Sequence, residues 1–224
     1  MNLQAIKILF LKDLFLCRRY LFGYLAGALV SALLTVTPNQ TLSYIGFILM
    51  MTVAIGSGIH MIAVLLLSES TDQTRLFVMS LPVSLLDYSI GKMSVVLATY
   101  LLPWSTMFAL TVIGTIVLPE AHDGKVVVIP AIFLFLFASF MLQLAVAVVS
   151  ESVGMTISVM VAGNVLLNLF LMKISALPEV KAVSDSNLIV WPVAIQWTIL
   201  MEVLFIVLAL GVSFWFQTRT RDLV

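Results

Sequence analysis

The chain has 224 residues, of which 62% are hydrophobic and 10% are charged, and its formal net charge at pH 7 is zero. A mean hydropathy of +1.18 is typical of integral membrane proteins and excludes an ordinary soluble domain. The zero net charge says nothing about nucleic acid, but no patch of the sequence is basic enough to bind it. A single cysteine, Cys17, excludes an internal disulfide and a paired-cysteine metal site.

The first segment, 1–19, is too polar to cross a membrane. At 100° per residue its basic side chains and Gln4 fall within a sector of about 140°, and apolar side chains occupy much of the rest. Asp13 departs slightly from this pattern. The pattern is typical of an amphipathic helix in the membrane interface, with its cations among lipid headgroups. Such a helix either simply anchors the first span or also packs against a cytoplasmic partner.

Six later stretches are apolar enough to span a bilayer, which requires roughly 20 residues for each helix. Their runs are continuously apolar rather than alternating, which excludes a transmembrane barrel. The sequence therefore predicts an all-α integral membrane protein with one transmembrane domain over 1–224. The predicted spans are at about 21–37, 43–67, 93–118, 126–149, 154–174 and 195–216.

The basic residues are distributed unequally about these spans. Eight of the eleven Lys and Arg residues fall on one side, and Lys125, Lys173 and Lys181 fall on the other. By the positive-inside rule, both termini and the 68–92 loop are cytoplasmic and the 175–194 loop is outside. We expect the chain to lie in a bacterial cytoplasmic membrane.

The 68–92 loop contains signals for a short helix. Ser70 can cap a helix N-terminus while Gln73 reaches back to it, in the manner of a capping box. The helix is expected to end before Pro82, because proline disfavours helical geometry in the residue before it. The loop therefore predicts a cytoplasmic helix over about 71–81, bracketed by the second and third spans.

The segment 69–84, ESTDQTRLFVMSLPVS, followed by Gly91-Lys92, resembles the signature loop of ABC-2 type transporter permeases. In that family an acidic residue after the second span leads through a short helix to a SLPVS-like turn, and a GK pair opens the third span. The six-span outline, the N-terminal interface helix and the longer outer loop before the last span are also similar. The chain departs from the family at Leu85, where a basic residue is common.

The resemblance implies that the helix Thr71–Leu81 is a coupling helix seated on a separate cytoplasmic ATPase subunit, which would hold ATP and Mg²⁺. Glu69 would position the start of the helix, and Asp72 and Arg75 would make polar contacts. The chain itself is not expected to be an enzyme or to hold a cofactor, because Gly91-Lys92 lacks the rest of a phosphate-binding loop. The implied coupling residues are Glu69, Asp72, Arg75, Leu76, Phe77, Met79, Leu81 and Pro82.

Four polar side chains are predicted within the spans. Glu202 lies near the middle of the last span, where an acidic side chain costs about 2.5–3.5 kcal/mol. Asn164 and Asn168 are four residues apart and share one helix face, and Gln143 adds a further amide on the fourth span. Together they could line a polar seam at a subunit interface or along a substrate path. The alternative for the amides is hydrogen bonding between helices.

Two histidines invite other functions. His60 follows Gly56-Ser57-Gly58, but a serine and a histidine three residues apart on one helix cannot readily form a nucleophile–base pair, and close helix packing explains the glycines better. His122, with two nearby carboxylates, fits a solvated outer turn better than a metal site.

The sequence thus predicts a permease subunit of an ATP-binding-cassette exporter that works by alternating access. Six spans are half of the usual transporter, so we expect a second copy or a homologous permease as partner, in addition to the ATPase and membrane lipids. The substrate is an amphipathic peptide, a lipid-like molecule or a drug. The alternatives are a haem-exporter-type membrane subunit and a membrane scaffold or immunity protein that transports nothing.

Overall fold

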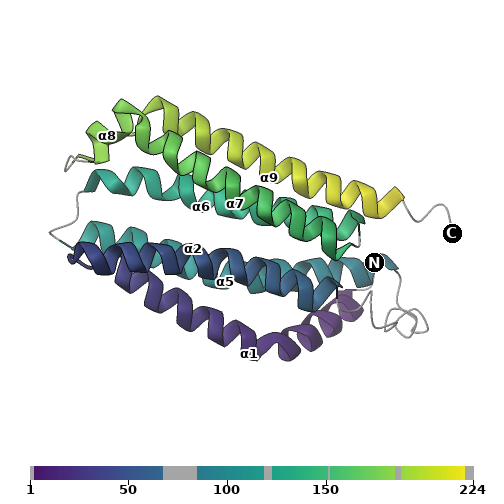
Figure 1. Ribbon diagram of the computed structural model, residues 1–224. Helices are drawn as coiled ribbons and strands as arrows, with labels where there is room; N and C mark the ends of the chain where they lie inside the picture. The colour runs from purple at the N-terminus through teal and green to yellow at the C-terminus, as the bar shows by residue number, and fades with distance from the viewer. Residues whose placement is uncertain (1–2, 68–84, 119–122, 151, 185–187, 220–224) are drawn as a thin grey trace.

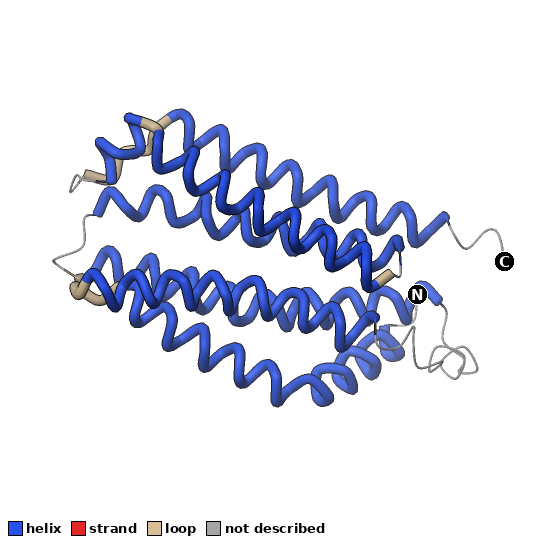
Figure 2. The backbone as a smooth tube through the Cα atoms, in the orientation of Figure 1, coloured by secondary structure: helices blue, strands red, loops and turns tan. Residues whose placement is uncertain are grey.

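Long helices that run side by side make up the part of the chain that the computed structural model describes (Figures 1 and 2). These are residues 3–67, 85–118, 123–150, 152–184 and 188–219. The helices are α1 (Leu3–Thr35), α2 (Gln40–Ile62), the π-helical η1 (Ala63–Leu67), α5 (Leu85–Val117), the 3₁₀-helical η2 (Asp123–Val127), α6 (Val128–Ser150), α7 (Val153–Ala176), α8 (Pro178–Ser184) and α9 (Val193–Arg219).

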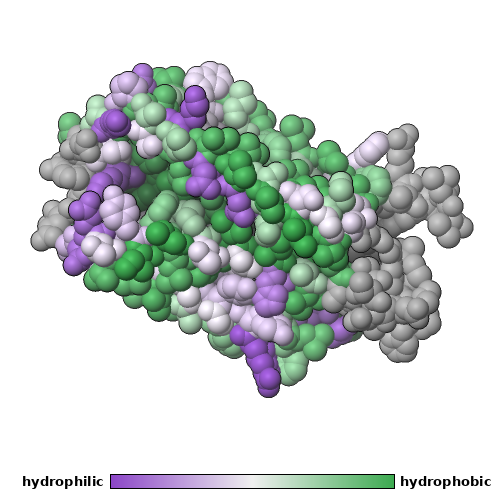
Figure 3. Space-filling view, viewed as in Figure 1, coloured by the Kyte–Doolittle hydropathy of each residue, from purple (hydrophilic) through white to green (hydrophobic). Residues whose placement is uncertain are grey.

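The predicted all-α membrane architecture is confirmed. Within the described ranges, six helical stretches are long and apolar enough to cross a membrane: Leu3–Thr35, Gln40–Leu67, Ile90–Val117, Gly124–Ser150, Val153–Ala176 and Val193–Ser213. Large apolar side chains cover much of the exterior, including Leu166 on α7 and Leu208 on α9, and Figure 3 shows this apolar surface on one face. An exposed apolar surface of this extent is expected where lipid covers the protein.

The six long helices form two groups of three. Helices α1, α2 and α5 pack together, and α6 packs with α7 and α9 (Figure 1). Aromatic side chains of α5 join the groups, because the Tyr100 ring stacks on Phe140 at a centroid distance of 3.8 Å and its hydroxyl donates to the Leu136 carbonyl at 3.3 Å. The Trp104 indole donates to the Phe133 carbonyl at 3.0 Å. Helix α6 is therefore the element through which the two groups meet.

Residues that favour helix N-termini explain where several helices begin. The Asn39 side chain accepts a hydrogen bond from the backbone N–H of Leu42 at 3.2 Å, which caps α2 directly after Pro38. Ser152 caps α7 in the same way. Pro178 occupies the first position of α8, where the missing backbone N–H costs nothing. These caps allow tight connections between long apolar helices.

The N-terminal segment differs from its prediction. A separate helix was expected over 1–19, but α1 is one unbroken helix from Leu3 to Thr35, with a bend that is visible in Figure 1. The buried side chains Leu9, Asp13, Cys17 and Leu21 recur every four residues and continue through the expected break. A continuous buried stripe, without an intervening proline or glycine, explains why the helix does not stop.

The ends of several helices gather at each end of the bundle. The start of α1, the end of η1, the start of α5 and the end of α9 lie together, and we call this the proximal end (Figure 1). The opposite, distal end carries the α1–α2 turn, η2 and α8. The cytoplasmic location of both termini stays a prediction, because residues 1–2 and 220–224 lie outside the described residues.

Candidate functional site

The predicted coupling segment itself lies outside the described residues. This applies to Glu69, Asp72, Arg75, Leu76, Phe77, Met79, Leu81 and Pro82, all within 68–84. The elements that it connects are described, namely η1 and the first turns of α5, both at the proximal end. The candidate site is therefore built from the side chains that hold these elements in place.

A buried ion pair joins α1 to the start of α5. The Lys92 ammonium lies 2.8 Å from a carboxylate oxygen of Asp13, and the two side chains are only 3% and 1% exposed. Lys12 lies 3.7 Å from the other oxygen of Asp13, but its side chain is 49% exposed. The pair within the bundle is therefore Asp13 with Lys92. Removing one partner of such a pair leaves a charge buried without compensation, which is strongly destabilising.

Close packing surrounds this pair. Gly91 faces α1 so closely that a Cβ atom there would lie 3.4 Å from the Cβ of Leu9. The Lys92 ammonium also lies 5.8 Å from the centre of the Tyr88 ring, within the range of a cation–π contact. Cys17, one turn after Asp13, is fully buried. The first turns of α5 are therefore fixed to α1 by both charge and packing.

This ion pair was not predicted from the sequence, although the position of Asp13 is a signal of it. At 100° per residue, Asp13 lies about 170° from the centre of the basic sector of segment 1–19, so it belongs to the opposite face. A carboxylate on the apolar face is costly to bury, so it indicates a charged or hydrogen-bonding partner within the bundle. Lys92 could not be identified as that partner from spacing alone, because 79 positions of chain separate it from Asp13.

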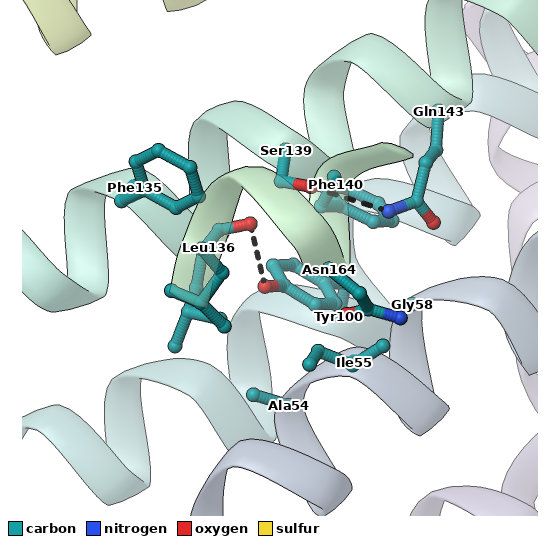
Figure 4. Close-up of a pocket in the computed structure, with 12 residues that line it drawn as sticks. Ala54, Ile55, Gly58, Tyr100, Phe135, Leu136, Ser139, Phe140, Gln143 and Asn164 are labelled. Atoms are coloured by element: carbon teal, nitrogen blue, oxygen red, sulfur yellow. Dashed lines mark hydrogen bonds between the residues drawn. The ribbon is translucent and has the colours of Figure 1, made fainter. Parts of the chain in front are cut away.

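Two of the four predicted intramembrane polar residues meet in one small cavity. Gln143 of α6 and Asn164 of α7 both line a cavity of about 10 Å³, together with Tyr100 of α5 (Figure 4). This is close to the smallest volume that holds one water molecule. The Gln143 amide donates to the Ser139 hydroxyl at 3.4 Å, and its carbonyl oxygen has no hydrogen-bond partner among the described residues. This site can bind a water molecule but has no room for a substrate.

The other two residues lie apart from that cavity. Asn168 is exposed on α7 and donates to the backbone carbonyl of Asn164 at 2.9 Å. Glu202 is 8% exposed, and neither of its carboxylate oxygens is hydrogen-bonded within the described part of the chain. On α9 it lies between Ile195 and Ile206, both of which pack against α6 residues. The four side chains therefore do not form one continuous seam in a single chain.

The Ser57 and His60 side chains have separate partners. The Ser57 hydroxyl donates to the Ala54 carbonyl at 3.1 Å, whereas a His60 ring nitrogen lies 2.9 Å from the Tyr24 hydroxyl. A Cβ atom on Gly58 would approach Phe140 to 2.9 Å, so this glycine allows α2 and α6 to pack closely. In the described ranges, no three His, Cys, Asp or Glu side chains gather as metal ligands.

The arrangement therefore joins the start of α5 to α1 by a buried ion pair at the proximal end, and it holds against α6 an acid with no hydrogen-bond partner among the described residues. No protein-family model, curated protein or solved structure matches this chain.

Proposed function

We propose that the chain is the membrane-spanning permease subunit of an ATP-binding-cassette exporter, driven by a separate cytoplasmic ATPase. The observation that supports this most is the position of the two elements that flank 68–84 in the sequence. The end of η1 and the start of α5 lie at the end of the bundle where α1 begins and α9 ends (Figure 1). In a bacterial cytoplasmic membrane that end would face the cytoplasm, where the ATPase is.

The ion pair gives such a subunit a way to transmit movement. A partner that pulls on the coupling helix 71–81 moves the start of α5, and the Asp13–Lys92 pair carries α1 with it. Helix α2 moves as well, because η1 connects it to the coupling segment. η1 is a π-helical segment of a kind that often occurs at functional sites. Helices α1, α2 and α5 then move together against α6, α7 and α9, as alternating access requires.

The exposed amide of Asn168 supports the expectation of a second permease chain. Its neighbours on the exposed face of α7 are apolar, such as Val165 and Leu169. An amide within a span gains hydrogen bonds when it faces another helix rather than lipid. The paired chains would export an amphipathic peptide, a lipid-like molecule or a drug.

Co-purification of the tagged chain from its native membrane tests this function. We expect a soluble ATPase to accompany the wild-type chain, and Arg75→Glu or Phe77→Ala to reduce its recovery while the chain still inserts into the membrane. Lys173→Glu, at the distal end of α7, is the matched control and should retain the ATPase. Equal recovery with all three variants would contradict coupling through 71–81, and no ATPase with the intact chain would favour a membrane scaffold instead.

A further inference from the structure

A second cavity, far larger than the one beside Gln143, opens at the distal end. Its volume is about 470 Å³, within the usual range for small-molecule sites, and it lies between the α1–α2 turn, the end of α5, η2 and the start of α6. The space-filling view shows polar residues around a hollow at this end of the molecule, with apolar residues inside it (Figure 3). We call it the distal cavity.

The inner part of the distal cavity is apolar. Phe47 and Met50 of α2 line it from one side, and Ile129 and Phe133 of α6 line it from the other. Met50 is 2% exposed and Phe133 is 1% exposed, so the cavity reaches the core of the bundle. An alkyl chain or another apolar group fits such a surface, because it is removed from water there.

Most hydroxyl groups in the wall are already used as donors. Four of them donate to backbone carbonyls at 2.7 Å: those of Thr35, Thr37, Ser43 and Thr115. The side-chain donors that remain are the Lys125 ammonium, the Gln40 amide and the Tyr44 hydroxyl, none of which is hydrogen-bonded to a described residue. All three residues are exposed and therefore accessible to a ligand.

The charge of the rim favours an anion. Lys125 is the one charged residue among the lining residues, and no carboxylate of the described ranges pairs with it. Gln40 is the first residue of α2, a helix of 23 residues whose dipole adds partial positive charge at its N-terminus. The Lys125 ammonium, the Gln40 amide and the Tyr44 hydroxyl thus lie at the mouth of a cavity whose inner part is apolar.

We propose that the distal cavity binds an amphipathic anion: an acidic head, phosphate or carboxylate, held by Lys125, Gln40 and Tyr44, and a short apolar tail against Phe47 and Met50. The head gains a charge-assisted hydrogen bond from Lys125, and the tail gains burial. This binding site is independent of any ATPase partner, so it stands or falls separately from the proposed transport function.

Titration of the purified full chain with octyl phosphate tests the proposal. The protein is placed in neutral phosphatidylcholine nanodiscs and labelled with ¹³C at its methionine methyl groups, and the Met50 signal is assigned with Met50→Leu. We expect octyl phosphate to shift the Met50 signal saturably. Octanol and octyltrimethylammonium, which lack the acidic head, should bind at least about tenfold more weakly, since a hydrogen bond to a charged group contributes that much.

Two variants separate the roles of head and tail. Lys125→Glu should weaken octyl phosphate binding by roughly tenfold or more, while Lys181→Glu, on α8 at the same end, should leave the affinity unchanged. Ile129→Trp should block binding by filling the inner part. Unchanged methionine signals elsewhere show that each variant remains folded, and Lys125 is exposed, so its replacement tests the site without disturbing the core.

The proposal is overturned if Lys125→Glu binds octyl phosphate as the wild type does, or if the three octyl compounds bind equally. It is also overturned if inorganic phosphate competes as well as octyl phosphate, because the apolar part would then contribute nothing. Nanodiscs that contain phosphatidylglycerol identify the source of a natural ligand. If phosphatidylglycerol displaces octyl phosphate, the natural ligand is a membrane lipid. If it does not, the natural ligand comes from the aqueous phase.

Discussion

Two buried acidic residues, Asp13 and Glu202, are held in different ways. Asp13 has a cation at 2.8 Å, whereas no cation of the described part of the chain pairs with Glu202. In a medium of low dielectric constant, a paired charge can stabilise the fold, while an unpaired polar group costs free energy. The first residue therefore serves structure, and we infer that the second serves assembly or transport.

Breaking the ion pair should weaken the fold. Asp13→Ala removes the carboxylate that lies 2.8 Å from the buried Lys92 ammonium, so we expect a free energy of unfolding lower by about 3–5 kcal/mol, measured by denaturation with SDS in mixed micelles. Replacing both residues, Asp13→Leu with Lys92→Met, should restore most of that loss. Lys12→Ala, which removes only an exposed cation, serves as control and should change stability by less than about 1 kcal/mol. Equal effects of Asp13→Ala and Lys12→Ala would show that the pair is unimportant.

Replacing Glu202 should have the opposite effect. Glu202→Leu removes a buried group with no hydrogen-bond partner among the described residues, so we expect the isolated chain to become more stable by about 1–3 kcal/mol. Transport, or assembly with a second chain, should nevertheless be lost, as should the activity of Glu202→Gln. Both properties can be compared on one preparation by unfolding and by vesicle transport assays. Full activity of Glu202→Gln would contradict a functional role for the charge.

At the scale of helices, glycines determine how closely neighbouring helices approach. Gly46 of α2 packs directly on the backbone at the end of α1, with the Leu34 carbonyl carbon 2.6 Å from the position of an added Cβ. Gly163 of α7 packs on Ser139 of α6 in a similar way. Small residues commonly allow such close contacts between membrane helices. The hairpin of α1 and α2 therefore depends on Gly46.

Gly46→Ala should destabilise this hairpin, because the new methyl group meets backbone atoms that cannot move away independently. We expect a loss of about 1–3 kcal/mol in the free energy of unfolding. Gly56→Ala, on the same helix with nothing within 4 Å of its Cβ position, is the matched control and should cause no loss. A loss of equal size in both variants would show that the close contact at Gly46 is not its cause, because helix propensity by itself favours alanine over glycine.

For the whole molecule, the arrangement of helices gives two ends but does not itself say which one faces the cytoplasm. The proximal end holds both the start of α1 and the end of α9, and the distal end holds α8 (Figure 1). The excess of basic residues predicts that the proximal end is cytoplasmic. The positions of Lys181 and Arg221 allow this prediction to be tested.

Cysteine labelling of intact cells should reveal the orientation. In a chain with Cys17→Ala, Lys181→Cys should react with a membrane-impermeant maleimide added outside, since α8 is at the distal end. Arg221→Cys should react only after the membrane is permeabilised. The reverse pattern would show that the protein has the opposite orientation in the membrane. It would then exclude coupling to a cytoplasmic ATPase through the 68–84 segment.

The sequence alone predicted the membrane class and five of the six spans to within a few residues, whereas the first span begins 18 residues earlier than predicted. These follow from local properties, because apolar runs and charged ends depend only on neighbouring residues. It also identified Glu202 as a costly residue within a span. The role of 71–81 remains a prediction, since that segment lies outside the described residues.

Tertiary packing decided what could not be predicted from local patterns. The unbroken α1, the pairing of Asp13 with Lys92, the separation of Glu202 and Asn168 from the Gln143 cavity and the existence of the distal cavity all involve residues far apart in the chain. Hydropathy shows which residues enter the bilayer, but not which faces of the helices meet. The partners of buried polar groups are therefore fixed only when those faces pack together, because it is this packing that determines which opposing groups come within hydrogen-bonding distance.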